Sequence, residues 1–220
     1  MAINKKFRED FLKVAVNFEK SELTTFGPGK GSISARDLGS GQILITPSGL
    51  GFSQLLPDDL IVLGLDGKKI SGDLKPSLDS VFHLAVYRAR TDVGGIIHTH
   101  SPYATSYACS GKPILPMIMG MVIMVGGQAD VAPFAFPGTK ELGENIVRAL
   151  GKKNATIMEQ HGVLAVGKTL SRALSVASTL ENTAQIQFLC ESRGELRPLD
   201  EKTVLDGIEF EKGYGQGKNK

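Results

Sequence analysis

The 220-residue sequence has few of the features that place a chain in a specialised class. Tryptophan is absent and aromatic residues make up 6% of the chain, so a row of stacking side chains for single-stranded nucleic acid is not expected. The net charge of +2 argues neither for nor against a nucleic-acid partner, and no basic run exceeds Lys5-Lys6-Phe7-Arg8. Two cysteines, Cys109 and Cys190, form no motif and no disulfide framework, which predicts a reducing, cytoplasmic environment.

Long hydrophobic runs are also missing. The longest, Ile114 to Val125, contains Pro116 and Gly120 and is shorter than the roughly 20 apolar residues that span a bilayer. It is rich in methionine, whose usual role is adaptable packing, and we interpret it as interior sequence. The first residues lead from Met1 into charged, helix-like sequence without the apolar core of a signal peptide. No membrane association is expected.

The patterns that are present predict one α/β domain over residues 1–220, with a central sheet and helices on its faces. Apolar residues at helical spacing predict helices over 7–19, 78–90, 101–110, 138–150 and 170–191. Short apolar or alternating runs predict strands at 31–36, 42–45, 60–65, 94–100, 156–158 and 163–166. The tail from Gly213 is rich in glycine and lysine and is expected to be mobile.

Two histidines close the apolar run Gly94-Gly95-Ile96-Ile97-His98-Thr99-His100. Residues two apart on a strand point to the same face, so His98 and His100 are expected to project side by side. His161 lies far downstream, also beside an apolar run. Three imidazoles in such settings predict a tetrahedral metal site. The alternatives are that they are histidines packed in the core, or that His98 and His100 are a surface pair.

Three loops offer backbone N–H groups and a hydroxyl: Gly29-Lys30-Gly31-Ser32, Thr46-Pro47-Ser48-Gly49 and Pro76-Ser77. Such loops can form anion-binding nests, and Ser77 is also the expected cap of the following helix, whose dipole favours anions. Each loop alone can be an ordinary turn. Together with a metal site they predict a phosphorylated substrate lying across a cation.

These motifs resemble the class II aldolase/adducin-head family, whose members include L-fuculose-1-phosphate aldolase and L-ribulose-5-phosphate 4-epimerase. The resemblance rests on Thr46-Pro47-Ser48-Gly49, Pro76-Ser77-Leu78-Asp79, the strand with His98 and His100, and Gln160-His161-Gly162, and it covers residues 7–214. It implies an α/β/α sandwich around a central, largely antiparallel sheet. It also implies a homotetramer with active sites between subunits.

The resemblance further implies a role for each matching residue. A divalent metal, usually Zn²⁺ with Mn²⁺ or Co²⁺ as alternatives, would be bound by His98, His100 and His161, and by Asp79 when no substrate is present. Asp79 would also shuttle a proton, the alternative being a charge that stabilises a helix N-terminus. His83, one turn beyond Asp79, is expected to be structural. The family's phosphate-binding residues match Gly31, Ser32, Thr46, Ser48, Gly49 and Ser77.

The chain departs from the family at several positions. The aldolases place a tyrosine where this chain has Gly120, and the epimerases use an aspartate in the same region. Leu78 stands where the family has a serine, and Ser32 where it has an asparagine. Tyr214 matches the mobile C-terminal tyrosine of the aldolases, so it is the remaining candidate for a second acid/base group, unless it belongs to a frayed terminus.

The function implied is that of a zinc-dependent class II aldolase, an aldehyde-lyase. It would cleave a small ketose 1-phosphate, similar to L-fuculose 1-phosphate, into dihydroxyacetone phosphate and an aldehyde by way of a metal-stabilised enediolate. An L-ribulose-5-phosphate 4-epimerase-like reaction and the decarboxylation of a sugar-acid phosphate use the same chemistry and stay open. A non-enzymatic assembly module like the adducin head is less consistent with the sequence, because such heads lack the histidines.

Overall fold

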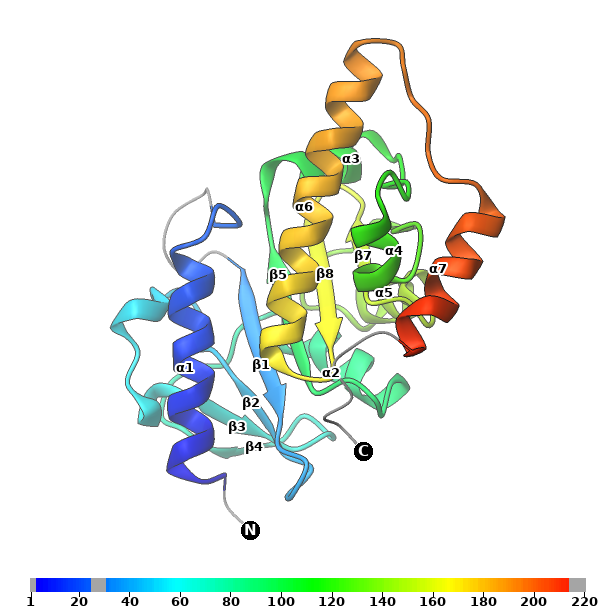
Figure 1. The fold of residues 1–220 in the computed structure, drawn as a ribbon. Helices are drawn as coiled ribbons and strands as arrows, with labels where there is room; N and C mark the ends of the chain where they lie inside the picture. Colours follow the sequence, from blue (N-terminus) through cyan, green and yellow to red (C-terminus); the bar gives the residue numbers. More distant parts are fainter. Residues whose placement is uncertain (1–2, 25–30, 214–220) are drawn as a thin grey trace.

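The computed structural model describes residues 3–24 and 31–213, and its strands form one central sheet (Figure 1). In the described residues the strands are β1 (Ser32–Arg36), β2 (Ile43–Ile45), β3 (Ile61–Leu63), β4 (Lys69–Ser71), β5 (Gly95–Thr99), β6 (Val131–Ala132), β7 (Ala155–Met158) and β8 (Gly162–Gly167). Their order is β4-β3-β2-β1-β5-β8-β7-β6. Neighbours pair antiparallel except for β6 and β7. The predicted largely antiparallel sheet is confirmed.

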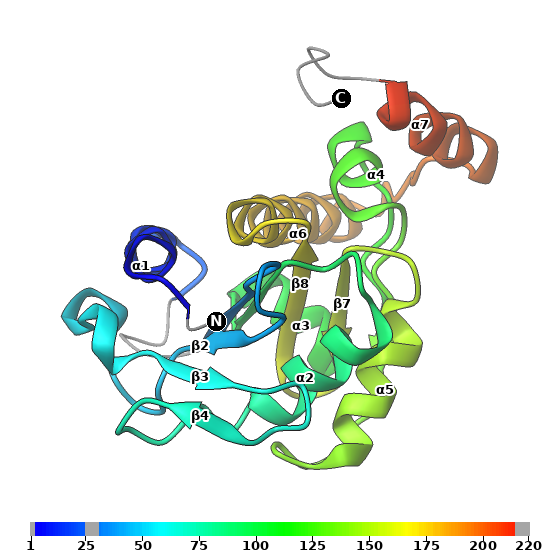
Figure 2. The ribbon, with the colours of Figure 1, turned by 90° about the horizontal axis from the view of Figure 1, so that it is seen from below.

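Helices cover both faces of the sheet, as the view in Figure 2 shows. They are α1 (Lys5–Glu19), α2 (Ser80–Ala89), α3 (Pro102–Ser110), α4 (Met119–Val125), α5 (Lys140–Leu150), α6 (Leu170–Ser192) and α7 (Glu201–Gly213). One apolar cluster joins α1, α3, α4 and α6 to one face, and a second joins α2 and α5 to the other. The α/β/α sandwich is therefore confirmed. No helix in the described part of the chain is long and apolar enough to cross a membrane.

The alternation of side chains along the central strands determines which residues reach which helices. On β5, Ile97 belongs to the cluster beneath α6, whereas Ile96 belongs to the cluster of α2 and α5. His98 shares the face of Ile96, and its ring packs edge-on against Phe82 of α2 with the ring centroids 5.5 Å apart. Thr99 faces the other way, and its hydroxyl donates a hydrogen bond to the carbonyl of Leu23.

Most of the predicted helices are confirmed, with side-chain caps where the sequence supplies them. The Thr139 hydroxyl accepts a hydrogen bond from the N–H of Leu142 at the start of α5, and the Asn4 side chain accepts one from Phe7 at the start of α1. The prediction that Ser77 caps α2 is wrong. The helix begins at Ser80, with Asp79 at the N-cap position and no side-chain cap hydrogen bond.

Two helices were not predicted from the sequence. Helix α4 contains Gly120 inside the methionine-rich run, and α7 follows a polar segment with weak periodicity. The two helices pack against each other, and a Cβ atom at Gly207 of α7 would lie 2.6 Å from the Met119 side chain of α4. Tertiary packing therefore stabilises both helices despite poor local signals.

Candidate metal centre and phosphate pocket

Three histidines from separate parts of the chain meet at one end of the central strands. His98 lies on β5, His100 follows directly after it, and His161 lies in the tight turn between β7 and β8. One potential ligand atom from each lies within 4.8 Å of the other two. The ring centroids of His98 and His100 are 4.5 Å apart, and those of His98 and His161 are 4.8 Å apart. The structure therefore brings together the three histidines that the sequence proposed as metal ligands.

The ring nitrogens of this cluster suit a cation. The Nδ1 atom of His98 lies 2.8 Å from the carbonyl oxygen of Val163. Since a carbonyl only accepts, Nδ1 carries the proton and Nε2 carries a free lone pair. His98 Nε2 and His161 Nδ1 are buried and lack a hydrogen-bond partner in the described structure. Buried polar atoms without partners are costly, and coordination of a divalent metal by neutral imidazoles would satisfy them.

Burial keeps these imidazoles neutral. Removal from solvent lowers the pKa of His98 to about 3, despite the attraction of the Asp79 carboxylate. The same cause lowers the pKa of His161. Neutral rings are the form that binds a metal, so protons do not compete for these ligands near neutral pH.

The turn that carries His161 depends on its neighbours on both sides. Gln160 adopts a positive φ of 52°, a conformation that is uncommon for a residue with a side chain and that turns the chain towards β8. At Gly162 a Cβ atom would lie 2.6 Å from the carbonyl oxygen of Thr99 and 2.9 Å from Cδ2 of His100. Glycine therefore allows the His161 turn to pack directly on the strand that carries the other two histidines.

Substitution Gly162→Ala is expected to disturb this packing. We expect a loss of about 1–3 kcal/mol in the free energy of unfolding from overpacking, and metal affinity weakened by at least about tenfold because His100 is displaced. Urea unfolding and titration of the metal-free protein with Zn²⁺ measure the two effects. Gly39→Ala is the matched control, because a Cβ there meets nothing closer than 3.8 Å. Unchanged zinc affinity in Gly162→Ala would contradict the role given to this close contact.

Asp79 lies beside the histidine cluster at the N-terminus of α2. Its Oδ2 atom accepts a hydrogen bond of 3.2 Å from the Ser77 hydroxyl, and its backbone N–H donates one of 3.2 Å to the Ser77 hydroxyl oxygen. Burial raises the pKa of the Asp79 carboxyl, but electrostatic interactions with His98, His83 and Ser32 outweigh burial and lower the pKa below its usual value. Asp79 is not one of the residues whose potential ligand atoms lie within 4.8 Å of one another. That cluster consists of the three histidines.

A cavity of about 240 Å³ lies next to this carboxylate. The Thr46–Ser48 backbone runs alongside Lys75–Ser77, with the N–H of Ser77 bonded to the carbonyl of Thr46 and that of Ser48 to the carbonyl of Lys75, both at 3.1 Å. This pairing brings the predicted phosphate loops together. The cavity is lined by Gly31, Pro47, Ser48, Gly49, Ser77, Leu78 and Asp79. These residues supply hydroxyls and backbone groups, with no lysine or arginine among them.

Two of the residues matched to phosphate binding are buried behind this cavity. The hydroxyl of Thr46 bonds to the backbone of Ile33, and that of Ser32 lies 2.9 Å from Nε2 of His83. The side chains of Ser32 and Thr46 therefore stabilise the loops through buried hydrogen bonds and do not line the cavity. His83 is fully buried, with its other nitrogen 2.6 Å from the Ser34 hydroxyl, so the prediction of a structural role is confirmed. Lys30 and Tyr214, the second acid/base candidate, lie outside the described residues.

Glu181 supports the site in a way that the sequence did not reveal. This residue of α6 is 8% exposed, and its two carboxylate oxygens accept hydrogen bonds of 2.9 Å from the N–H groups of Tyr103 and Ala104. It thus caps the start of α3, directly after His100, from another helix. The helical pattern around Glu181 gives no local signal for this, because its partners lie 77 and 78 positions away.

The buried histidines predict an acid-sensitive fold. An unfolded histidine has a pKa of about 6.5, whereas burial lowers the pKa of His83 to about 4 and that of His98 to about 3. The unfolded chain therefore binds more protons below pH 6.5, and stability falls as the pH drops towards 4. We expect the metal-free protein to lose on the order of 2–3 kcal/mol per buried histidine between pH 7 and 4.5.

Urea unfolding of metal-free protein across this pH range measures the loss. The variant His83→Gln should show a shallower pH dependence than the parent, since one of the contributing groups is removed. A free energy of unfolding that stays constant from pH 7 to 4.5 would contradict the burial argument.

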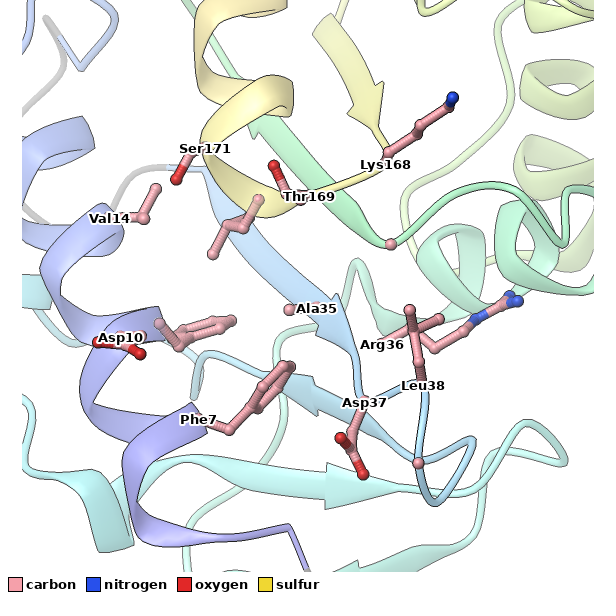
Figure 3. A pocket seen from close by; sticks show the side chains of 14 residues that line it. Phe7, Asp10, Val14, Ala35, Arg36, Asp37, Leu38, Lys168, Thr169 and Ser171 are labelled. Carbon is pink, nitrogen blue, oxygen red and sulfur yellow. The ribbon is translucent and has the colours of Figure 1, made fainter. Parts of the chain in front are cut away.

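A second cavity, of about 360 Å³, lies at the opposite end of β1 from His98 (Figure 3). Phe7 and Val14 of α1, Ala35 and Leu38 line one part of it, and Lys168, Thr169 and Ser171 at the start of α6 line another. In Figure 3 the Arg36 guanidinium points away from the space, and it hydrogen-bonds to the carbonyl of Tyr87. None of the predicted site residues lines this cavity.

Comparison with known proteins extends these observations over nearly the whole chain. A family model described as the class II aldolase and adducin N-terminal domain matches residues 9–188. The chain is 34% identical over 211 residues to a 5-deoxy-D-ribulose 1-phosphate aldolase of Bacillus thuringiensis serovar kurstaki, with 96% of this chain and 98% of the relative covered. It is 30% identical over 201 residues to a 3-oxo-tetronate 4-phosphate decarboxylase of Pectobacterium atrosepticum, with 88% of each covered. A solved structure of an L-fuculose 1-phosphate aldolase superposes with a TM-score of 0.91 at 29% identity, covering 96% of this chain and 98% of that one.

Proposed function

Because the chain belongs to the class II aldolase and adducin N-terminal domain family, we propose that it is a zinc-dependent aldolase that cleaves a small ketose 1-phosphate. The products are dihydroxyacetone phosphate and an aldehyde. The observation that carries the proposal is the position of the three-histidine cluster beside a cavity lined by phosphate-type loops, with Asp79 between them. No other group of described residues combines potential metal ligands, a proton acceptor and an anion pocket.

His98, His100 and His161 would hold Zn²⁺, with Mn²⁺ or Co²⁺ as alternatives, because three neutral imidazoles suit these borderline cations. A divalent cation bound there supplies Lewis-acid polarisation of the ketose carbonyl and stabilises negative charge on the adjacent oxygens. Asp79 would also contact the cation in the absence of substrate, because its carboxylate is close enough to His98 and His161 to interact electrostatically with both.

The phosphate would occupy the 240 Å³ cavity. Ser48, Gly49 and Ser77 contribute hydroxyls and N–H groups at its wall. Gly31 contributes backbone, since a Cβ atom at this position would collide with the carbonyl oxygen of His98. Ser32 and Thr46 would contribute indirectly, because their buried hydroxyls stabilise these loops through hydrogen bonds. A phosphate bound here would place the sugar carbons next to Asp79.

Cleavage requires two proton movements. The bond between the third and fourth carbons breaks, the hydroxyl on the fourth carbon loses a proton as the aldehyde forms, and the third carbon gains a proton. We assign the proton of the third carbon to Asp79, whose lowered pKa makes it a carboxylate at neutral pH. Tyr214 is our candidate for the proton of the hydroxyl.

The substrate is proposed as a short ketose 1-phosphate of the L-fuculose 1-phosphate or 5-deoxyribulose 1-phosphate type, the substrates in the names of similar proteins. A 4-epimerase-like reaction and a decarboxylase reaction are the alternatives, and one similar protein is named a decarboxylase. Gly120 favours cleavage over epimerisation. The aldolases have a tyrosine at this position and the epimerases an aspartate in the same region, whereas this exposed glycine has no side chain that could hold the aldehyde until the carbon–carbon bond forms again.

The test is a product assay on zinc-loaded protein. Both ketose 1-phosphates, L-ribulose 5-phosphate and a 3-oxo-tetronate 4-phosphate are supplied, and dihydroxyacetone phosphate, the 4-epimer and CO₂ are measured. We expect dihydroxyacetone phosphate and an aldehyde from a ketose 1-phosphate, abolished by a chelator and restored by Zn²⁺. Release of CO₂ or accumulation of the 4-epimer as the main product would overturn the aldolase proposal.

The family resemblance also leads us to propose a homotetramer with active sites between subunits. Exposed apolar side chains near the site are consistent with burial by another copy, with Phe136 73% exposed and Leu78 60% exposed. Light scattering coupled to size-exclusion chromatography gives the mass directly. A monomer mass at working concentration would remove this part of the proposal.

A further inference from the structure

The short turn between β5 and α3 carries one of the proposed metal ligands. His100 follows the last residue of β5, and only Ser101 separates it from Pro102, the first residue of α3. Proline at this position has its φ fixed near −65°, which leaves the turn little freedom. A displacement of the start of α3 would therefore be transmitted to the His100 ring.

The start of α3 is not capped by its own N-cap residue. A serine at this position usually accepts a hydrogen bond from the N–H of the second or third helical residue. Ser101 makes no such bond, and its buried hydroxyl has no partner within the described residues. The N–H groups of Tyr103 and Ala104 donate to the two carboxylate oxygens of Glu181 instead, both at 2.9 Å. Glu181 thus satisfies two amides that the start of a helix leaves without intrahelical partners.

One face of α6 holds this part of α3. Glu181, Gln185 and Phe188 are four and three positions apart, so their side chains lie on the same side of the helix. The Gln185 side chain donates a hydrogen bond of 3.4 Å to the Tyr103 hydroxyl, and the Phe188 and Tyr103 ring centroids are 5.8 Å apart. Phe188 is 48% exposed, whereas Glu181 is 8% exposed. Glu181 is therefore the buried member of this row, and it bonds to the backbone itself.

We propose that Glu181 is a positioning residue for the metal centre. By holding the start of α3, it keeps the His100 ring where it can bind a divalent cation together with the other two histidines. The inference rests on the metal site of the proposed function. Two hydrogen bonds from one carboxylate fix an orientation as well as a distance, which suits this role. If Glu181 only stabilised the packing of α3 on α6, changing it would affect unfolding and leave the metal affinity of the folded protein unchanged.

Titration of the metal-free protein with Zn²⁺ in a competing chelator tests this role without an activity assay. Glu181→Gln keeps the size of the side chain but turns an NH₂ group towards one of the two amides. It is expected to weaken Zn²⁺ binding by about 10–100-fold, the usual effect of losing a group that orients a ligand. Glu181→Asp keeps the charge, but its shorter side chain cannot reach both amides from the same backbone position. It is expected to weaken binding by about tenfold.

Glu19→Gln is the matched control. The two carboxylate oxygens of Glu19 accept hydrogen bonds of 2.7 Å from the N–H groups of Phe52 and Ser53, so they hold a backbone turn in the same way. That turn contains no histidine. Both glutamine variants are expected to unfold at a lower urea concentration than the parent, but only Glu181→Gln should bind Zn²⁺ more weakly. An equal loss of zinc affinity in Glu19→Gln would point to general destabilisation and overturn the inference.

The remaining outcomes separate this inference from the proposed function. Parental zinc affinity in both Glu181 variants would overturn the positioning role and leave the metal site standing. Weak binding by Glu181→Gln with parental binding by Glu181→Asp would assign the effect to the charge of the carboxylate, and that also contradicts positioning. A parent protein that binds no Zn²⁺ would remove the metal site and the role of Glu181 with it. Should Glu181→Gln fail to fold, Glu181→Asp, which retains a carboxylate for the cap, decides the question alone.

Discussion

His161→Ala is expected to lose its bound zinc and all measurable aldolase activity, and so are His98→Ala and His100→Ala. Each histidine contributes one of three potential ligand atoms that lie within 4.8 Å of one another. Loss of a residue that merely orients a ligand costs about 10–100-fold in metal affinity, so loss of a ligand itself should cost at least about 100-fold. Two imidazoles alone leave too much of the tetrahedral shell open to hold the ion against a chelator.

Metal content after dialysis and titration with Zn²⁺ in a competing chelator measure these effects. His83→Gln is the matched control, because both ring nitrogens of this fourth histidine bond to serines and it should keep its zinc. Circular dichroism verifies that each alanine variant is folded. If His161→Ala retained full zinc content and activity, the proposed metal site would be wrong.

Asp79→Asn is expected to keep the fold and most of the metal while lowering kcat by about 10²–10⁴-fold, the usual range for removal of a general acid/base. The amide is nearly the same size and can still bond to Ser77, but it cannot accept a proton. The competing explanation is a stabilising charge at the N-terminus of α2. That role predicts a loss of about 1 kcal/mol in stability with little change in rate.

Steady-state kinetics and urea unfolding of the same samples distinguish the two roles. Asp200→Asn is a suitable control, because Asp200 accepts a hydrogen bond of 2.7 Å from the N–H of Thr203 near the start of α7. Asp200→Asn should lower the free energy of unfolding by a similar amount without lowering kcat. A rate for Asp79→Asn within about threefold of the parent would exclude Asp79 from the reaction.

Much of the site could be predicted because its signals are local. The period of a strand places His98 and His100 on one face whatever lies around them, and their ring centroids are indeed 4.5 Å apart. Thr139 caps α5 because a hydroxyl three positions before an N–H can reach it within one turn. The phosphate-type loops were recognisable by their glycines and hydroxyls, and Ser48, Gly49 and Ser77 do line one cavity.

Predictions from local sequence were wrong where contacts with a distant segment determined where a helix begins or forms. Ser77 is a residue type that often caps helices, but its N–H pairs with the carbonyl of Thr46 and its hydroxyl with Asp79. Helix α2 therefore starts at Ser80, two residues later than a cap at Ser77 would place it. Gly120 lowers the helical propensity of the methionine-rich run. Packing of Met121 and Val125 in the apolar core forms α4 there nonetheless.

By itself, the sequence determined which side chains share a strand face or a helix turn: His98 with His100, Ser32 with Ser34, and His83 with Tyr87. Only the tertiary structure decided which of these faces meet. The pairing of β5 with β8, and of β8 with β7, brings His161 to His98. The packing of α2 on β1 joins the two ring nitrogens of His83 to Ser32 and Ser34. The physical reason is that periodicity repeats within a few residues, whereas partners distant in sequence are selected by burial of the whole sheet, which no local pattern encodes.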